Sequence, residues 1–144
     1  MAAPAGLGPE INMDFIAGFV AAARRKEMRA VLELLVADPA LISRDMVNDV
    51  LKYKRLDGVT QALGRLAEGL FPNGRQRVLD LAAVAAIPAP MTVIWGGDDR
   101  ILPAAQADRL PDPVTVHRLS GVGHMPHLEA AAEVNRLIEA ALDA

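Results

Sequence analysis

The sequence predicts an α/β fold in which a helical segment precedes a β-α-β-α unit with parallel strands. Residues 11–86 carry apolar side chains at helical spacing. Residues 91–95 form a short, mostly apolar run with β-branched side chains, typical of a strand buried on both faces of a parallel sheet. Residues 114–119 alternate like a second strand. Because two strands cannot make a complete sheet, we expect only part of an α/β domain.

Residues that cap or break helices divide the helical segment. Asp38-Pro39 interrupts the second helix, since proline cannot continue it. Ser43 is the expected N-cap of the third helix, and Asp57 is a plausible cap for the fourth. The turn at residues 71–74 closes the fourth helix. The expected helices span about 11–26, 27–37, 43–55, 57–70 and 76–84.

Basic residues are predicted to close two of these helices. A helix dipole favours positive charge at the C-terminal end, so basic side chains there indicate where a helix stops. On this basis the first helix is expected to end in Arg24, Arg25 and Lys26. The third helix is expected to end in Lys52, Lys54 and Arg55.

Residues 91–142 supply the β-α-β-α unit. The first strand stops at a glycine-rich turn, residues 96–99. Pro103 is well placed to begin a helix that runs through Leu110, because proline fits the first helical position. After the second strand, the glycines of residues 121–123 precede a final helix over about 128–142.

Composition and charge exclude several classes of function. The formal net charge of −3 argues against nucleic-acid or anionic-membrane partners. No apolar stretch approaches the roughly 18–20 residues that cross a bilayer, and residues 1–9 lack the features of a secretory signal. The absence of cysteine excludes disulfides and thiolate metal sites and fits a reducing compartment, so we expect a cytoplasmic protein.

Two acidic side chains follow the first strand. Asp98 and Asp99 come directly after Gly96-Gly97, where the chain turns away from the strand tip. The carboxyl ends of strands are where catalytic groups gather in open α/β sheets. An isolated pair of aspartates in a turn is more often structural, so this loop alone does not indicate chemistry.

A histidine follows the second strand. His124 lies in a glycine-rich loop, 25 positions after Asp99, with one helix and one strand between them. Parallel neighbouring strands would bring both loops to the same edge of the sheet. An aspartate there can fix the imidazole tautomer while the other ring nitrogen transfers a proton. His117 and His127 are interpreted as surface or structural residues.

Together the two loops resemble the acid and histidine motifs of the α/β-hydrolase superfamily. GxxDxxxP spans residues 96–103 and GxGHxxxxE spans residues 121–129. The resemblance implies that Asp99 is the acid of a catalytic triad and His124 its base, with Asp98 as the competing acid. It also implies a partial α/β-hydrolase fold, with a linker and helical cap over residues 1–74 and the C-terminal β-α-β-α part of the core over residues 75–144.

A closer resemblance is to the acetyltransferase component of acetoin dehydrogenase complexes. It is carried by residues 4–12, by residues 51–59 and by the run Glu129-Ala130-Ala131. The resemblance implies transfer of an acyl group from a lipoyl-lysine arm to coenzyme A, with other subunits of such a complex as partners. No residue of this chain is assigned to binding a cofactor or a metal.

The nucleophile of such a triad is missing from the sequence. The only serines are Ser43, which is expected to cap a helix, and Ser120, which precedes the histidine loop. Asp57 lacks the small neighbours that an aspartate elbow would need. We therefore expect the chain alone to be inactive, although an intact parent would be an acyltransferase acting on a small acyl substrate. Two alternatives are a serine hydrolase or esterase relative, and a non-catalytic, truncated or half-domain protein whose sheet another chain completes.

Apolar side chains of the cap are candidates for an acyl pocket. They are Phe15, Phe19, Met28 and Tyr53. Apolar helical residues more often form a core than contact substrate.

Overall fold

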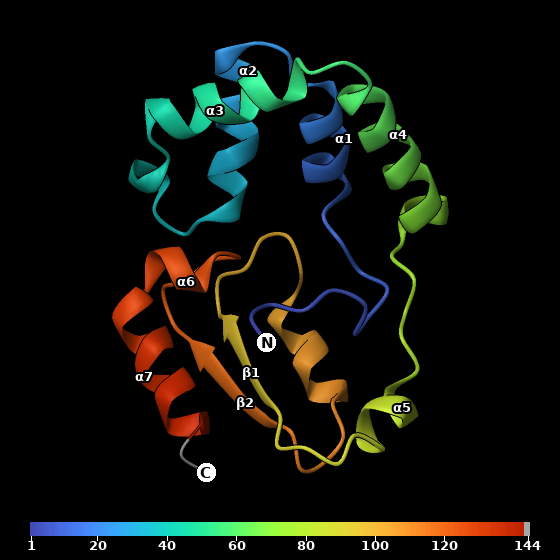
Figure 1. The fold of residues 1–144 in the computed structure, drawn as a ribbon, viewed down its shortest axis with the longest axis vertical. Coiled ribbons are helices and arrows are strands. Elements are labelled where there is room, and N and C mark those ends of the chain that lie inside the picture. The colour runs from blue at the N-terminus through green and yellow to red at the C-terminus, as the bar shows by residue number, and fades with distance from the viewer. Residues whose placement is uncertain (143–144) are drawn as a thin grey trace.

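The computed structural model describes residues 1–142 and places four helices at one end of the molecule and a small parallel sheet at the other (Figure 1). The helical end, called the cap below, consists of α1 to α4. The other end, called the core part, contains the two strands, a 3₁₀ segment and the last helices. The predicted order, a helical segment followed by β-α-β-α, is confirmed. The cap helices are α1 (Met13–Ala21), α2 (Arg25–Leu32), α3 (Arg44–Lys54) and α4 (Val59–Leu70).

The strands are β1 (Thr92–Gly96) and β2 (Thr115–Leu119), and they pair in parallel, with Thr92 opposite Thr115. The first residues of the chain extend this sheet. Ala3 N donates to the carbonyl of Ile94 at 2.9 Å, and Ile94 N donates to the carbonyl of Met1 at 2.8 Å. The outer edge of β1 is therefore partly covered by residues 1–3.

The prediction that Arg24, Arg25 and Lys26 end the first helix is wrong. Helix α1 ends at Ala21, and these cations begin α2, with Arg24 at the N-cap position. The carboxylate of Glu27 accepts hydrogen bonds from the backbone N–H groups of Ala23 and Arg24, both at 3.1 Å. Glu27 thus satisfies N–H groups that a new helix leaves unpaired, and the helix starts here despite its basic first residues.

Lys54 closes α3 as predicted, but its side chain turns inward. It is only 7% exposed, and its Nζ donates to the carbonyls of Ala22 at 2.7 Å and Val20 at 3.1 Å, and also to that of Phe19. These carbonyls lie at the C-terminal end of α1, where a helix leaves acceptors unpaired. Burial lowers the pKa of the Lys54 ammonium. Lys54 therefore fastens α3 to α1.

Two other predicted helix starts are also corrected. Gly58, with φ +81°, is the N-cap of α4 in place of Asp57. Residues 75–80 are not helical, and α5 spans only Leu81–Ala85. The backbone of this segment pairs instead with the N-terminal segment: Gln76 N donates to Pro9 O at 3.0 Å, and Leu79 N donates to Gly6 O at 2.8 Å.

The remaining helices differ from the prediction in type and extent. The helix expected after Pro103 is a 3₁₀ segment, Ala104–Arg109, with Pro103 as its N-cap. The last helix begins earlier than expected and is broken in two, α6 (Pro126–Glu129) and α7 (Ala131–Leu142). Ala130 separates them, since its φ of −135° and ψ of 46° are not helical. Helix α2 continues only as a 3₁₀ turn, Glu33–Leu35.

Each end of the molecule has its own apolar cluster. Trp95, with no exposed surface, packs with Val93, Leu102 and neighbouring residues in the core part. Met28, also without exposed surface, belongs to the cluster of the cap, together with Val36 and neighbouring residues. Among residues 1–142, no helix is both long and apolar enough to cross a membrane.

Candidate active site

The loop after β1 holds Asp99 in a fixed orientation. Its carboxylate has no exposed surface, and Oδ1 accepts hydrogen bonds from Ile101 N at 2.8 Å and Leu102 N at 2.9 Å. Oδ2 accepts a hydrogen bond of 3.0 Å from the indole Nε1 of Trp95. Three N–H groups therefore hold the carboxylate in place independently of its contact with the histidine.

Asp98, the competing acid, points elsewhere. Its side chain is exposed, and its backbone N–H donates to the carbonyl of Val122 at 2.9 Å. Asp98 thus joins the two loops through its backbone, whereas Asp99 turns its side chain into the site.

His124 meets Asp99 across the tips of the two strands. Nδ1 of His124 lies 2.8 Å from Oδ2 of Asp99, and the imidazole retains 24% of its exposure. The backbone N–H of His124 donates to the carbonyl of Leu35 in the cap at 2.9 Å. Since Asp99 occupies Nδ1, Nε2 is the ring nitrogen left for proton transfer.

Two glycines allow the loops to pack backbone against backbone. A Cβ atom on Gly96 would lie 1.9 Å from the carbonyl oxygen of Gly123. A Cβ on Gly123 would lie 2.8 Å from the backbone nitrogen of Ala37. No side chain fits at either position, so the acid loop, the histidine loop and the cap touch directly at this point.

Glu129 clamps the histidine loop, a role that the sequence analysis missed. Its carboxylate accepts hydrogen bonds from Gly123 N at 3.0 Å, Met125 N at 3.2 Å and Ala37 N at 2.7 Å. The residues on both sides of His124 are thereby held, and the cap is tied to the same carboxylate. The motif spacing identified Glu129 but gave no reason for it.

Arg100 and Asn12 connect the acid loop to the cap. The guanidinium of Arg100 donates to the carbonyl of Val36 at 2.6 Å and also to that of Glu33. The side-chain amide of Asn12 donates to the carbonyl of Arg100 at 2.8 Å. The position of Asp99 therefore depends on the cap as well as on β1.

The other histidines and the serines lie outside this arrangement. His117 is in β2 opposite Ile94, and His127 is exposed on α6. Ser43 Oγ accepts from Met46 N at 3.1 Å as the predicted N-cap of α3, while Ser120 follows β2. The part of the chain that the structure describes gives neither serine a hydrogen bond to His124. The site can thus orient a base and accept a proton, but it does not itself present a serine nucleophile.

The candidates for an acyl pocket separate in the structure. Phe15 and Phe19 line an apolar groove of about 120 Å³ between α1 and α4. Met28 belongs to the cap core instead, and Tyr53 is 60% exposed. Only the two phenylalanines remain available as contacts for an apolar ligand.

Comparison with known proteins gives a family match over nearly the whole chain. The family described as "Alpha/beta hydrolase family" matches residues 1–137. The chain is 43% identical over 139 residues to the dihydrolipoyllysine-residue acetyltransferase component of the acetoin cleaving system of Cupriavidus necator. It is 46% identical over 134 residues to the same component from Pseudomonas putida. These matches cover 96% and 93% of this chain but only 37% and 35% of the relatives, so the chain spans about a third of their length.

Solved structures share the fold. The chain superposes on a meta-cleavage product hydrolase from Pseudomonas fluorescens with a TM-score of 0.81 at 19% identity, over 99% of this chain and 54% of that one. A 2-hydroxy-6-oxo-6-phenylhexa-2,4-dienoate hydrolase from a Rhodococcus species gives a TM-score of 0.79 at 17% identity, with 99% and 54% covered. Likeness at these identities shows the fold alone.

Proposed function

This chain belongs to the alpha/beta hydrolase family, and on that premise we propose that it is the C-terminal portion of an acyl-transfer enzyme. The observation that carries the proposal is the pair formed by Asp99 and His124, with 2.8 Å between Oδ2 and Nδ1. The relatives with 43% and 46% identity support acetyl transfer within an acetoin-cleaving system as the specific reaction. We also propose that residues 1–74 form a linker and the helical cap, and that residues 75–144 form the C-terminal β-α-β-α part of an α/β-hydrolase core.

In the proposed reaction His124 acts twice. Nε2 first removes the proton from a nucleophilic hydroxyl as its oxygen attacks the acyl carbon of a thioester, and the same nitrogen then gives that proton to the departing thiolate. In the second half, Nε2 removes the proton from the acceptor thiol and returns it to the nucleophile. Asp99 remains a carboxylate throughout and stabilises the imidazolium that forms in each half.

The nucleophile in this scheme comes from outside the 144 residues. Ser43 is used as a helix cap and Ser120 follows β2, so neither supports the role. Among the described residues, 1–3 alone cover the edge of the sheet beside β1, and further strands carrying a nucleophile would pair at this edge. We propose that such strands belong to the same protein or to a second chain, and that this chain alone is inactive.

The groove between α1 and α4 supports an apolar acyl donor. Phe15, Phe19 and Leu63 contribute to a lining that is almost entirely apolar. An alkyl arm such as that of lipoyl-lysine fits this chemistry, because it buries hydrocarbon without leaving a polar group unpaired. Coenzyme A is the acceptor in this proposal, and the other subunits of an acetoin-cleaving system are the partners.

A chimera tests the proposal. The segment of the Cupriavidus necator relative that aligns with this chain is replaced by residues 1–142, and acetyl transfer from acetyl-dihydrolipoamide to coenzyme A is measured. We expect transfer by the chimera, loss of transfer in His124→Gln, and retained transfer in the matched control His117→Gln. A folded chimera that neither transfers nor hydrolyses acyl groups would contradict the proposal.

Hydrolysis is the second candidate function. The chain is 30% identical over 121 residues to a 2-hydroxymuconate semialdehyde hydrolase from a Pseudomonas species, a match that covers 78% of this chain. The same acid–histidine pair supports attack by water on an acyl-enzyme. A chimera that hydrolyses acyl substrates, even with coenzyme A in excess, would favour this function over transfer.

A further inference from the structure

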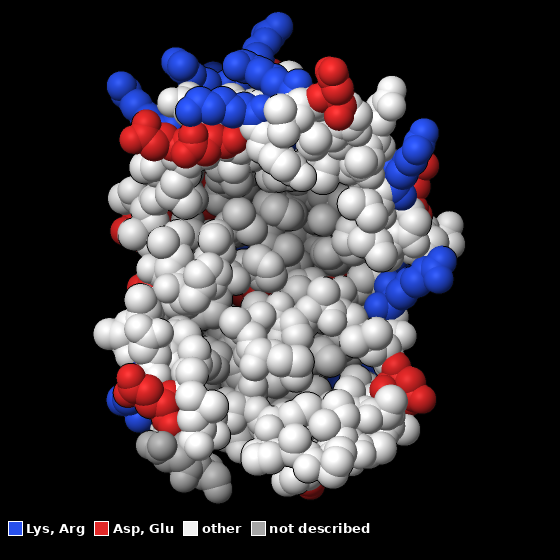
Figure 2. Space-filling model, viewed as in Figure 1, with Lys and Arg blue, Asp and Glu red and all other residues white. Residues whose placement is uncertain are grey.

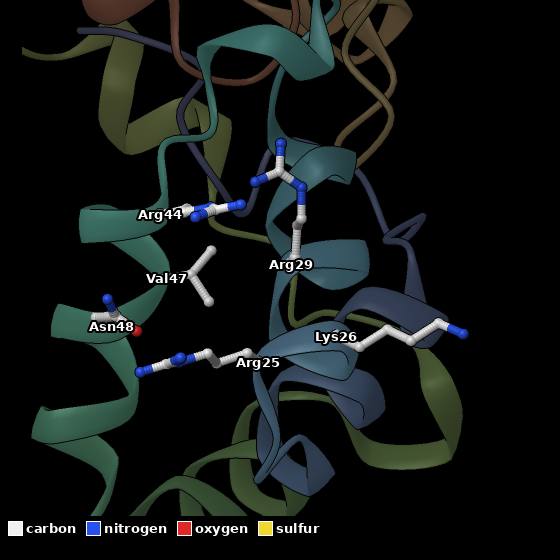
Figure 3. Close-up of a pocket in the computed structure, with 6 residues that line it drawn as sticks. All are labelled: Arg25, Lys26, Arg29, Arg44, Val47 and Asn48. Carbon is white, nitrogen blue, oxygen red and sulfur yellow. The ribbon is translucent and has the colours of Figure 1, made fainter.

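A groove of about 720 Å³ lies between α2 and α3, on the cap and outside the candidate active site. Its lining residues are Arg25, Lys26, Arg29, Arg44, Val47 and Asn48. Figure 3 shows the side chains of Arg25, Arg29 and Arg44 extending into the space between the two helices, while Lys26 turns away from α3. Basic side chains gather at this end of the molecule, as Figure 2 shows.

Three of the four cations that line this groove occupy positions that disfavour positive charge. Arg25 and Lys26 lie in the first turn of α2, and Arg44 is the first residue of α3. The N-terminus of a helix carries a partial positive charge, so a cation there is repelled by the helix as well as by its neighbours. Cations at helix N-termini destabilise the fold unless an anion neutralises them. We therefore expect this arrangement where an anion binds.

One carboxylate pairs with a cation of the groove, and the other carboxylates of α2 and α3 are engaged elsewhere or do not line it. Arg29 Nε pairs with Glu33 at 2.8 Å, and Asp49 pairs with Lys52 at 3.0 Å. Glu27 caps the start of α2 through backbone N–H groups. Asp45 lies in the first turn of α3 but does not line the groove.

Three of the four cations that line the groove have no carboxylate partner among the described residues. Within residues 1–142, Arg25, Lys26 and Arg44 form no salt bridge. No acidic residue contributes to the lining. Within the described part of the chain, Glu33 therefore neutralises Arg29, whereas Arg25 and Arg44 extend into the groove without a salt-bridge partner.

We propose that the groove between α2 and α3 binds a small molecule with two or more linked phosphates, such as the diphosphate of a nucleotide. Guanidinium groups match phosphate oxygens in pairs, and Asn48 adds an amide donor. Val47 forms an apolar floor between the charged groups. The hollow shape favours a small polyanion over a flat acidic protein surface. The proposal does not depend on the acyl-transfer function.

The groove is connected to the candidate active site through the main chain. Arg29 precedes Leu35 by less than two helical turns, and the carbonyl of Leu35 accepts the backbone N–H of His124. The diphosphate has two possible sources. One is a free nucleotide. The other is coenzyme A, whose thiol arm would extend from the groove toward His124.

Isothermal titration calorimetry on the 144-residue chain tests the site with pyrophosphate, ADP and coenzyme A as probes. We expect all three to bind at low ionic strength and to bind more weakly as salt is added. Arg25→Gln and Arg44→Gln should each weaken binding about tenfold or more, because each removes a charged donor. The matched control is Arg65→Gln, an exposed arginine on α4. It should leave affinity unchanged, and circular dichroism should show equal helix content in all variants.

Tighter binding of coenzyme A than of ADP would identify coenzyme A as the source, and equal binding would identify the nucleotide diphosphate alone. Three outcomes would overturn the proposal. They are the absence of binding by all three probes, an equal loss of affinity in Arg65→Gln, and binding of duplex DNA or an acidic peptide in place of the phosphate probes.

Discussion

The indole nitrogen of Trp95 donates its hydrogen bond to Oδ2 of Asp99, the same oxygen that faces His124. Trp95 is fully buried in the apolar cluster of the core part, so its ring cannot shift without disturbing that cluster. The acid of the proposed triad is thus oriented by the core of the fold.

Asp99→Asn should abolish most of the activity of an enzyme assembled with this chain. An asparagine amide can donate to Nδ1, which would force the proton onto Nε2 and remove the base, at a cost of about ten-thousand-fold in kcat. Single-turnover acyl transfer by the chimera measures this loss. Asp98→Asn is the matched control, because the Asp98 side chain is exposed. Equal losses in both variants would contradict the assignment of Asp99.

Glu129→Gln should destabilise the histidine loop. A glutamine amide retains one acceptor oxygen, so an N–H group among Gly123, Met125 and Ala37 would face another donor. Leaving a buried donor unpaired costs about 1–3 kcal/mol in the free energy of unfolding. Urea denaturation measures the cost. The exposed Glu139→Gln on α7 should stay within about 0.5 kcal/mol of the parent; a Glu129→Gln variant as stable as this control would exclude the clamp.

Gly96→Ala and Gly64→Ala should change stability in opposite directions. A Cβ at Gly96 meets the backbone of the histidine loop, and such overpacking costs about 1–3 kcal/mol or more. A Cβ at Gly64 meets nothing within 4 Å in α4, where alanine favours the helix by about 0.5–1 kcal/mol. Thermal melts should show a lower Tm for the first variant and a higher one for the second. An unchanged Tm in Gly96→Ala would refute the close approach of the two loops.

Lys54→Met should loosen α3 from α1. Loss of the charged donor at the end of α1 should lower the free energy of unfolding by about 1.5–3 kcal/mol. Lys52→Met, two residues earlier and exposed, should change it by no more than about 0.5 kcal/mol. Urea denaturation at neutral pH separates the two cases, and equal effects would argue against the buried role of Lys54.

The effect of Lys54→Met should also depend on pH. Burial lowers the pKa of Lys54 in the folded protein, so between the folded and the unfolded pKa values the unfolded chain binds more protons. The stability of the parent relative to Lys54→Met should therefore rise as the pH increases through this window. Denaturation of both proteins at pH 7 and pH 10 measures the difference, and a smaller difference at pH 10 would contradict the predicted sign.

Local signals in the sequence predicted the order of the elements and the two strands, and the family motifs predicted the acid–histidine pair; several helix ends were predicted wrongly. Ser43 caps α3 as expected, and the apolar run and the alternating run became β1 and β2. The parallel pairing of these strands is what brings Asp99 to His124 over 25 positions. The choice of Asp99 over Asp98 rested on motif spacing, and the orientations of the two side chains agree with it.

Long-range contacts explain what the sequence did not reveal. The donors to Glu129 include Ala37, which is distant in the chain, so no local pattern indicates the clamp. In the sequence, Lys54 looks like any cation at the C-terminal end of a helix. Its burial depends on the carbonyls of α1, which lie more than 30 positions earlier in the chain. Arg24 to Lys26 were assigned to the wrong helix because the turn before them contains only alanines and no recognisable helix breaker.

The tautomer of His124 tests the central claim most directly. ¹⁵N NMR of the neutral imidazole should show the proton on Nδ1, facing Asp99, with Nε2 free to accept a proton. In Asp99→Asn the proton should move to Nε2. A proton on Nε2 in the parent chain, or the same tautomer in both proteins, would contradict the account in which Asp99 prepares His124 as a base.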